Sequence, residues 1–90
     1  MDKIRVESNP SEERLKGLDT KSWPTWTCDV SEFDWHYDQN EACYFLEGEV
    51  TVETSQEKVD IKKGDLVFFP KDLDCKWCII KPVRKVYKLG

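Results

Sequence analysis

Hydrophobic and polar residues alternate along most of the chain after Trp23, which is the pattern expected of β-strands with one buried face. The runs are short, are separated by turn residues and recur about every ten residues, so about seven or eight strands are predicted in an all-β sandwich or barrel. The strand over residues 30–37 alternates most clearly. Its aromatic face carries Phe33, Trp35 and Tyr37, and its polar face carries Glu32, Asp34 and His36.

The first twenty-two residues have a different pattern, because they are charged and poor in aromatic side chains. Asn9 can cap a helix, Pro10 suits the first helical position and Gly17 is placed to end the helix. A short helix over residues 11–16 is therefore predicted. We divide the chain into an N-terminal extension with this short helix, residues 1–22, and one barrel domain, residues 23–90.

Composition supports a single folded domain. The 90 residues are 39% hydrophobic and 36% charged, which is enough apolar matter for one compact core. The net charge of -4 argues against a nucleic-acid-binding surface. No apolar run reaches the roughly 18 residues of a membrane span, and the start has no secretory signal. The expected location is soluble and intracellular, by default the cytoplasm.

Four cysteines and a C-terminal basic cluster are the remaining candidates for chemistry. Without a secretion signal the cysteines are expected to be reduced and mostly buried. Cys75 and Cys78 form a C-x-x-C pair, but on a strand they point to opposite faces. Cys75 and Cys43 are expected to fill the core; the alternative for Cys75 is a reactive thiol whose pKa is lowered by nearby Lys71 and Lys76. The cysteines are Cys28, Cys43, Cys75 and Cys78, and the basic cluster, predicted to be solvated, is Lys81, Arg84, Lys85 and Lys88.

Two segments together resemble a known fold family. EACYFLEGEVTV is followed by GDLVFFPKDLDCKW, so that a Glu, a turn Gly, a hairpin, Gly-Asp and Pro occur in the two-motif order of a cupin. The stretch over residues 23–87 resembles the small single-domain cupins grouped with ureidoglycine aminohydrolase. This resemblance implies a jelly-roll-type β-barrel with the short N-terminal helix outside it.

The resemblance also implies a candidate metal site. The ligand positions of metal-binding cupins fall on Asp34, His36, Glu41 and Cys75, so these four side chains are expected to converge inside the barrel. Such a set could hold zinc, manganese or iron, or it could form a metal-free polar pocket. His36 could instead be a hydrogen-bonded partner of Asp34 or Glu41. Tyr44 and Trp77 are expected in the core or the pocket wall.

Two functions remain open at this stage. In the first, the protein is an enzyme for a small polar metabolite, by resemblance a ureide or related nitrogen compound, with His36 and Glu41 as catalytic residues. In the second, it is a non-catalytic module that binds a small molecule and has lost the metal. The aromatic face of residues 33–37 needs a cover, which the second sheet, the N-terminal segment or a second copy of the chain could supply. Exposed aromatic patches mark interfaces, which predicts a homodimer.

Overall fold

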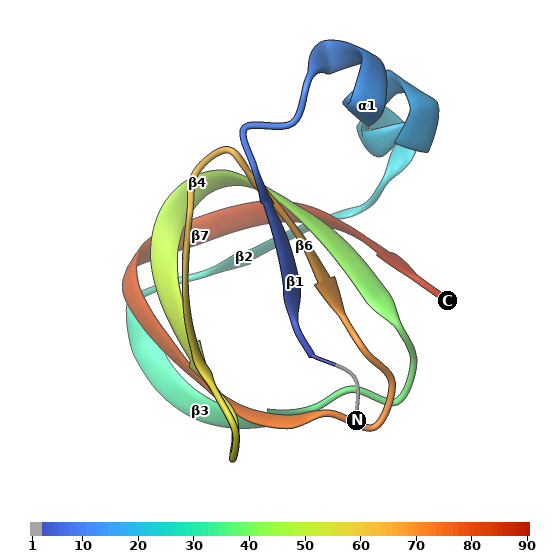
Figure 1. Ribbon diagram of the computed structural model, residues 1–90. Coiled ribbons are helices and arrows are strands. Elements are labelled where there is room, and N and C mark those ends of the chain that lie inside the picture. Colours follow the sequence, from blue (N-terminus) through green and yellow to red (C-terminus); the bar gives the residue numbers. More distant parts are fainter. Residues whose placement is uncertain (1–2) are drawn as a thin grey trace.

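The computed structural model describes residues 3–90, and its strands curl into an open-ended barrel with one helix outside it (Figure 1). This arrangement confirms the all-β class. No helix among the described residues is long and apolar enough to cross a membrane. The elements are β1 (Arg5–Ser8), α1 (Glu12–Leu18), the 3-10 turn η1 (Thr20–Ser22), β2 (Thr25–Cys28), β3 (Ser31–His36), β4 (Glu41–Glu53), β5 (Lys58–Lys62), β6 (Asp65–Phe69) and β7 (Asp74–Leu89).

Two long strands, β4 and β7, organise the barrel. They pair with each other in antiparallel register, and the strand order along the sheet is β1-β6-β4-β7-β2. On its other side, β4 pairs with β6 along its first half and with β5 along its second half. In the same way, β7 pairs with β3 along its first half and with β2 along its second half. The residue-to-residue pairing of β4 with β7 is irregular around Glu47 and Glu49, where both strands curve. Gly48 lies in this irregular stretch and has a φ of 100°.

The N-terminal segment differs from the prediction in two ways. Helix α1 is present, but Ser11 caps it by accepting a hydrogen bond from the Arg14 amide, and the helix continues through Gly17 to Leu18. Asn9 is not the cap, because it has a positive φ and its amide bonds the Gly64 carbonyl. The extension also contributes β1, which pairs with β6. A strand of four residues is too short for hydrophobic and polar alternation to be recognised in the sequence.

The aromatic face of β3 is turned to the interior of the barrel. Tyr37 is buried and stacks on Phe69, with ring centroids 4.7 Å apart, and Phe33 stacks on Trp77 at 6.0 Å. The barrel itself therefore covers most of this face, as the first of the three possible covers would. The polar face, with Glu32, Asp34 and His36, is exposed.

Candidate functional site

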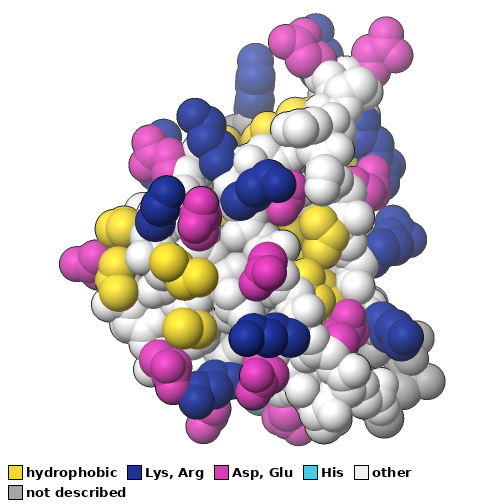
Figure 2. All heavy atoms as spheres, turned by 60° about the vertical axis from the view of Figure 1, so that its left-hand side comes forward, with side chains coloured by type: hydrophobic (Ala, Val, Ile, Leu, Met, Phe, Trp, Pro, Cys, Tyr) yellow, Lys and Arg dark blue, Asp and Glu magenta, His cyan; other side chains and the backbone are white. Residues whose placement is uncertain are grey.

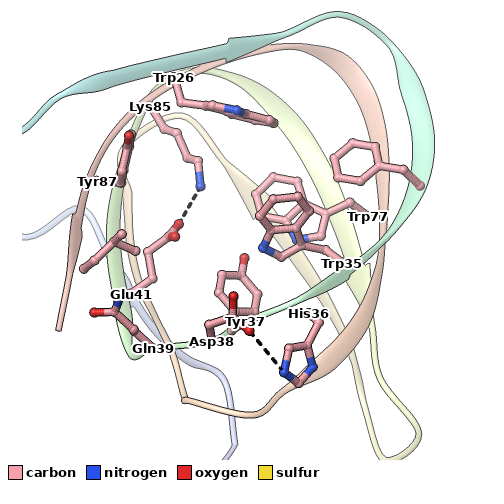
Figure 3. A pocket seen from close by; sticks show the side chains of 12 residues that line it. Trp26, Trp35, His36, Tyr37, Asp38, Gln39, Glu41, Trp77, Lys85 and Tyr87 are labelled. Carbon is pink, nitrogen blue, oxygen red and sulfur yellow. Dashed lines mark hydrogen bonds and ion pairs between the residues drawn. The ribbon is translucent and has the colours of Figure 1, made fainter.

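The barrel encloses a cavity of about 300 Å³ that opens at one end (Figure 3). Aromatic side chains form most of its wall, because β3 directs its aromatic face inward and β7 contributes Trp77 and Tyr87. This volume lies at the lower end of the range for small-molecule sites, about 300 to 1,000 Å³. The lining residues are Trp26, Phe33, Trp35, His36, Tyr37, Asp38, Gln39, Glu41, Trp77, Lys85, Tyr87 and Leu89.

A buried ion pair stands on one side of the cavity. The Lys85 ammonium lies 2.9 Å from Oε2 of Glu41, and the two side chains are only 6% and 10% exposed. The Cys43 thiol joins them, since its Sγ lies 3.0 Å from the same Glu41 oxygen and 3.2 Å from Lys85 Nζ. Lys85 comes from β7 and the other two residues come from β4, so the register of these two strands sets the contact.

Four aromatic rings surround the ammonium of Lys85. Its Nζ lies 4.9 Å from the ring centroid of Trp77, 5.0 Å from Trp26, 5.9 Å from Tyr87 and 6.0 Å from Phe45. Aromatic faces attract a cation through their quadrupole, and the attraction is stronger where water is excluded. The rings therefore help to offset the cost of taking this charge out of water.

The protonation state of this group follows from its surroundings. Burial alone would lower the pKa of Lys85, but the Glu41 carboxylate and the hydrogen bonds to Glu41 and Cys43 outweigh it, and the pKa is raised above its ordinary value. Burial raises the pKa of the Cys43 thiol far above its usual range, against the opposing effect of Lys85. At neutral pH the site therefore holds an ammonium and a neutral thiol, and neither is a nucleophile.

Two buried polar groups lie close together beside the cavity. The Tyr37 hydroxyl and the Trp77 indole N–H each have less than 1 Å² of accessible surface, and neither makes a hydrogen bond of good geometry within residues 3–90. Burial raises the pKa of Tyr37 far above its usual range, and the Trp77 indole acts weakly in the opposite direction. The indole also lies near the Cys75 thiol. Neighbouring side chains therefore cover both groups.

Comparison with known proteins decides the family. A model of the EutQ-like cupin domain matches residues 15–87. The chain belongs to the EutQ-like cupin family. No curated protein matches it.

Solved structures agree with this assignment of an EutQ-like cupin. A DUF861 family protein from Thermotoga maritima is 52% identical, with a TM-score of 0.94, over 98% of this chain and 100% of that chain. A putative ethanolamine utilization protein Q from Salmonella typhimurium is 30% identical, with a TM-score of 0.64, over 70% of this chain and 51% of that chain. The EutQ protein of Clostridium difficile is 19% identical and shares the fold, with a TM-score of 0.66 over 93% of this chain and 64% of that chain.

These matches confirm the all-β cupin fold predicted from the sequence. They support the cupin superfamily through its EutQ-like branch. They do not show the narrower group of ureidoglycine aminohydrolase, which the two motifs suggested.

The four predicted metal-site residues of this EutQ-like cupin do not converge. Glu41 is inside the barrel and bound to Lys85, whereas Asp34 is exposed on the outer face of β3, where it pairs in register with Lys76. No group of three or more His, Cys, Asp or Glu side chains within residues 3–90 is arranged to hold a metal ion. The expected convergence is therefore wrong, and these four residues do not fit a metal as one set.

His36 lies at the rim of the cavity and contacts Asp74 and the cavity-lining Asp38. Its Nδ1 is 2.7 Å from Oδ1 of Asp74, and its Nε2 is 3.6 Å from Oδ1 of Asp38. The Asp74 hydrogen bond is the main reason why the pKa of His36 is raised. The expected partners, Asp34 and Glu41, are not those observed. A catalytic role for His36 and Glu41 stays a prediction, without an observed contact between them.

The cysteines are free thiols, in agreement with the reduced state predicted for them. Cys75 is buried on the inner side of β7, and Cys78, three residues later, is half-buried and pairs with exposed Glu32. Burial raises the pKa of Cys75 to about 11. The burial of Cys75 agrees with core filling, and the raised pKa argues against the alternative of a thiol activated by Lys71 and Lys76.

Lys85 is the site residue that the sequence analysis missed. The basic cluster was predicted to be solvated, and Lys81 and Arg84 do lie on the surface beside Glu49 and Glu47. Figure 2 shows one face of the molecule, where charges of both signs are interspersed around small hydrophobic patches. Lys85 is instead 5% exposed. The available signal was the alternation of Val83, Lys85 and Tyr87, which places Lys85 on the inward side.

Proposed function

We propose that this EutQ-like cupin binds a small, partly polar metabolite inside its barrel. The observation that carries the proposal is an open cavity with aromatic walls and one buried ion pair. Apolar walls with a few convergent polar groups are typical of small-molecule sites. A buried ion pair stabilises a fold weakly or not at all compared with apolar residues of similar size, so a core selected only for stability would not require one.

Binding without catalysis is the alternative that the contacts favour. Oε2 of Glu41 already interacts with Lys85 and Cys43, so this oxygen is not free to act as a general base. His36 is engaged with Asp74 on the outer side. An enzyme acting on a ureide, as the aminohydrolase resemblance implies, would require one of these pairs to open.

The four tryptophans provide a direct test of this proposal. Trp26, Trp35 and Trp77 line the cavity, whereas Trp23 packs in a separate cluster with Leu66 and Val86. In a fragment screen followed by ¹⁵N NMR, bound fragments should shift the indole signals of the three lining residues and leave Trp23 in place. Fragments that shift only Trp23, or a broad screen that shifts no indole signal, would contradict the proposal.

A further inference from the structure

One oxygen of the Glu41 carboxylate is left without a protein partner. Its Oε2 accepts hydrogen bonds from Lys85 and Cys43, whereas its Oε1 has no hydrogen-bond partner within the described chain. The fully covered polar side-chain atoms that lack a partner in the same part of the chain belong to Tyr37 and Trp77, so Oε1 is not fully covered and keeps accessible surface. Glu41 lines the cavity, and Figure 3 shows its carboxylate inside it. Because a carboxylate oxygen only accepts hydrogen bonds, a molecule in the cavity meets an acceptor here.

The cation beside this oxygen has little to offer a ligand. Lys85 donates to Glu41 and to Cys43, aromatic rings surround its ammonium, and its side chain is only 6% exposed. At the mouth of the cavity, the side chains of His36 and Asp38 are 47% and 89% exposed, so water can serve them whether or not a ligand is bound. Among the charged groups of the cavity, Oε1 of Glu41 is therefore the one that discriminates between ligands.

The charge of the ligand follows from the neighbours of Oε1. An anion placed there would face the Glu41 carboxylate. A cation would lie beside the Lys85 ammonium, which is 2.9 Å from the other oxygen of the same carboxylate. Like charges repel strongly where water is excluded. A neutral N–H or O–H donor avoids both repulsions, and a hydrogen bond to an ionised group is roughly twice as strong as one between neutral groups.

Aromatic side chains indicate the rest of the ligand. Phe33, Trp35 and Tyr87 line the cavity, and Trp35 is 52% exposed, so part of this surface is open to an arriving molecule. Flat rings pack well against aromatic side chains. On the basis of the proposed binding function, we infer that the ligand is a neutral aromatic molecule that donates an N–H or O–H hydrogen bond to Oε1 of Glu41.

Three bicyclic probes of nearly the same shape test the donor. Indole carries an N–H group, benzofuran carries an acceptor oxygen in its place, and indene carries a CH₂ group. Each is titrated into the intact ¹⁵N-labelled protein while the indole N–H signals of its tryptophans are followed by NMR. We expect indole to bind at least about tenfold more tightly than benzofuran or indene, the effect of one hydrogen bond to a charged group. Neutral benzyl alcohol should also bind more tightly than benzylamine, its cationic counterpart.

The variant Glu41→Gln tests the contact itself. Its amide oxygen would stay toward Lys85, so its NH₂ donor would be presented to the cavity. Indole should then lose its advantage over benzofuran. Glu47→Gln, which changes an exposed partner of Arg84, is the matched control and should keep the wild-type ratio. The probe comparisons on the wild-type protein decide the question if Glu41→Gln does not fold.

The contrary outcomes separate this inference from the proposed function. Equal or tighter binding of benzofuran or indene in the cavity, or an unchanged ratio in folded Glu41→Gln, would overturn the donor contact. Tighter binding of benzylamine would overturn the neutral charge, and in all these cases the binding function would stand. If none of the probes binds but other fragments shift the indole signals of Trp26, Trp35 and Trp77, the inference alone fails. If no fragment shifts these signals, the proposed function fails as well.

Discussion

At the scale of single residues, the central feature is a charge pair held away from water. Removing an ion from water costs several kcal/mol even after relaxation, and the attraction between Glu41 and Lys85 offsets this cost only with further support. The Cys43 contacts and the rings around Lys85 supply that support. The pair is therefore coupled, and the removal of one partner should harm the protein more than the replacement of both.

We expect Glu41→Gln to lower the free energy of unfolding by about 3 to 5 kcal/mol, because it leaves the Lys85 ammonium buried without its counterion. The double variant Glu41→Gln/Lys85→Met should recover a large part of this loss. Urea denaturation at neutral pH measures both effects. A matched control is Glu47→Gln, which removes an exposed partner of Arg84 and should change stability by less than about 1 kcal/mol. Additive losses in the double variant would show that the two residues are not coupled.

The titration of His36 tests the other polar contact at the cavity rim. The pKa of His36 is raised above 6.5, mainly by the Asp74 hydrogen bond, and the chain has one histidine, so its NMR signal is unambiguous. The midpoint should lie above 6.5, and Asp74→Asn should lower it more than Asp38→Asn. Because the folded-state pKa is the higher one, this contact stabilises the protein fully below about pH 6.5, and its effect is lost as the pH rises through the folded-state pKa. A midpoint at or below 6.5 would contradict the contact.

At the scale of elements, the shape of the barrel depends on the point where β4 and β7 curve together. Gly48 has φ 100°, and a Cβ atom at this position would lie 2.4 Å from the backbone oxygen of Pro82. Neither the backbone angle nor the space suits another residue. This close approach allows the two long strands to turn from one half of the barrel to the other.

Gly48→Ala should therefore destabilise the protein by about 2 to 4 kcal/mol, from backbone strain and from the clash with Pro82. Thermal and urea denaturation measure the loss. Gly17→Ala is the matched control, because Gly17 lies in α1 with open space around its Cα, and alanine there should stabilise the helix by about 0.5 to 1 kcal/mol. If the two variants were equally stable, Gly48 would not be a conformational requirement.

The elements also show what the sequence could and could not predict. Period-two alternation located the strands, and the two motifs located the cupin fold, because both signals are local. Alternation divides β3 into two faces without saying which face is inside. The motif comparison placed Asp34 and His36 inward, but the larger apolar area of Phe33 and Tyr37 fills the interior.

The ion pair is a different case. Its partners, Glu41 and Lys85, are 44 positions apart and meet only through the β4–β7 register. Over this stretch the register is regular, from Glu41 opposite Leu89 to Phe45 opposite Lys85. The inward side of Lys85 follows from local alternation, but its pairing with Glu41 follows only from how the two strands are aligned.

At the scale of the whole molecule, the homodimer stays a prediction. The aromatic stripe that suggested it lies largely inside the barrel, and of the exposed large apolar residues Trp35 and Leu89 line the cavity. Val30 and Ile80, 58% and 53% exposed, remain on the outside. Light scattering at high micromolar concentration should return twice the 10.6 kDa chain mass if the protein is a dimer. A mass of one chain would end the prediction.

We propose that the barrel interior is a binding site and that the Lys85–Glu41 pair is a fixed part of its wall. The most direct measurement is a crystal structure of the wild-type protein soaked with the tightest fragment from the NMR screen. We predict electron density for the fragment inside the barrel, in contact with Trp26, Trp35 or Trp77, with the ion pair intact. Density only on the outer surface, or a fragment that displaces Lys85 from Glu41, would contradict this proposal.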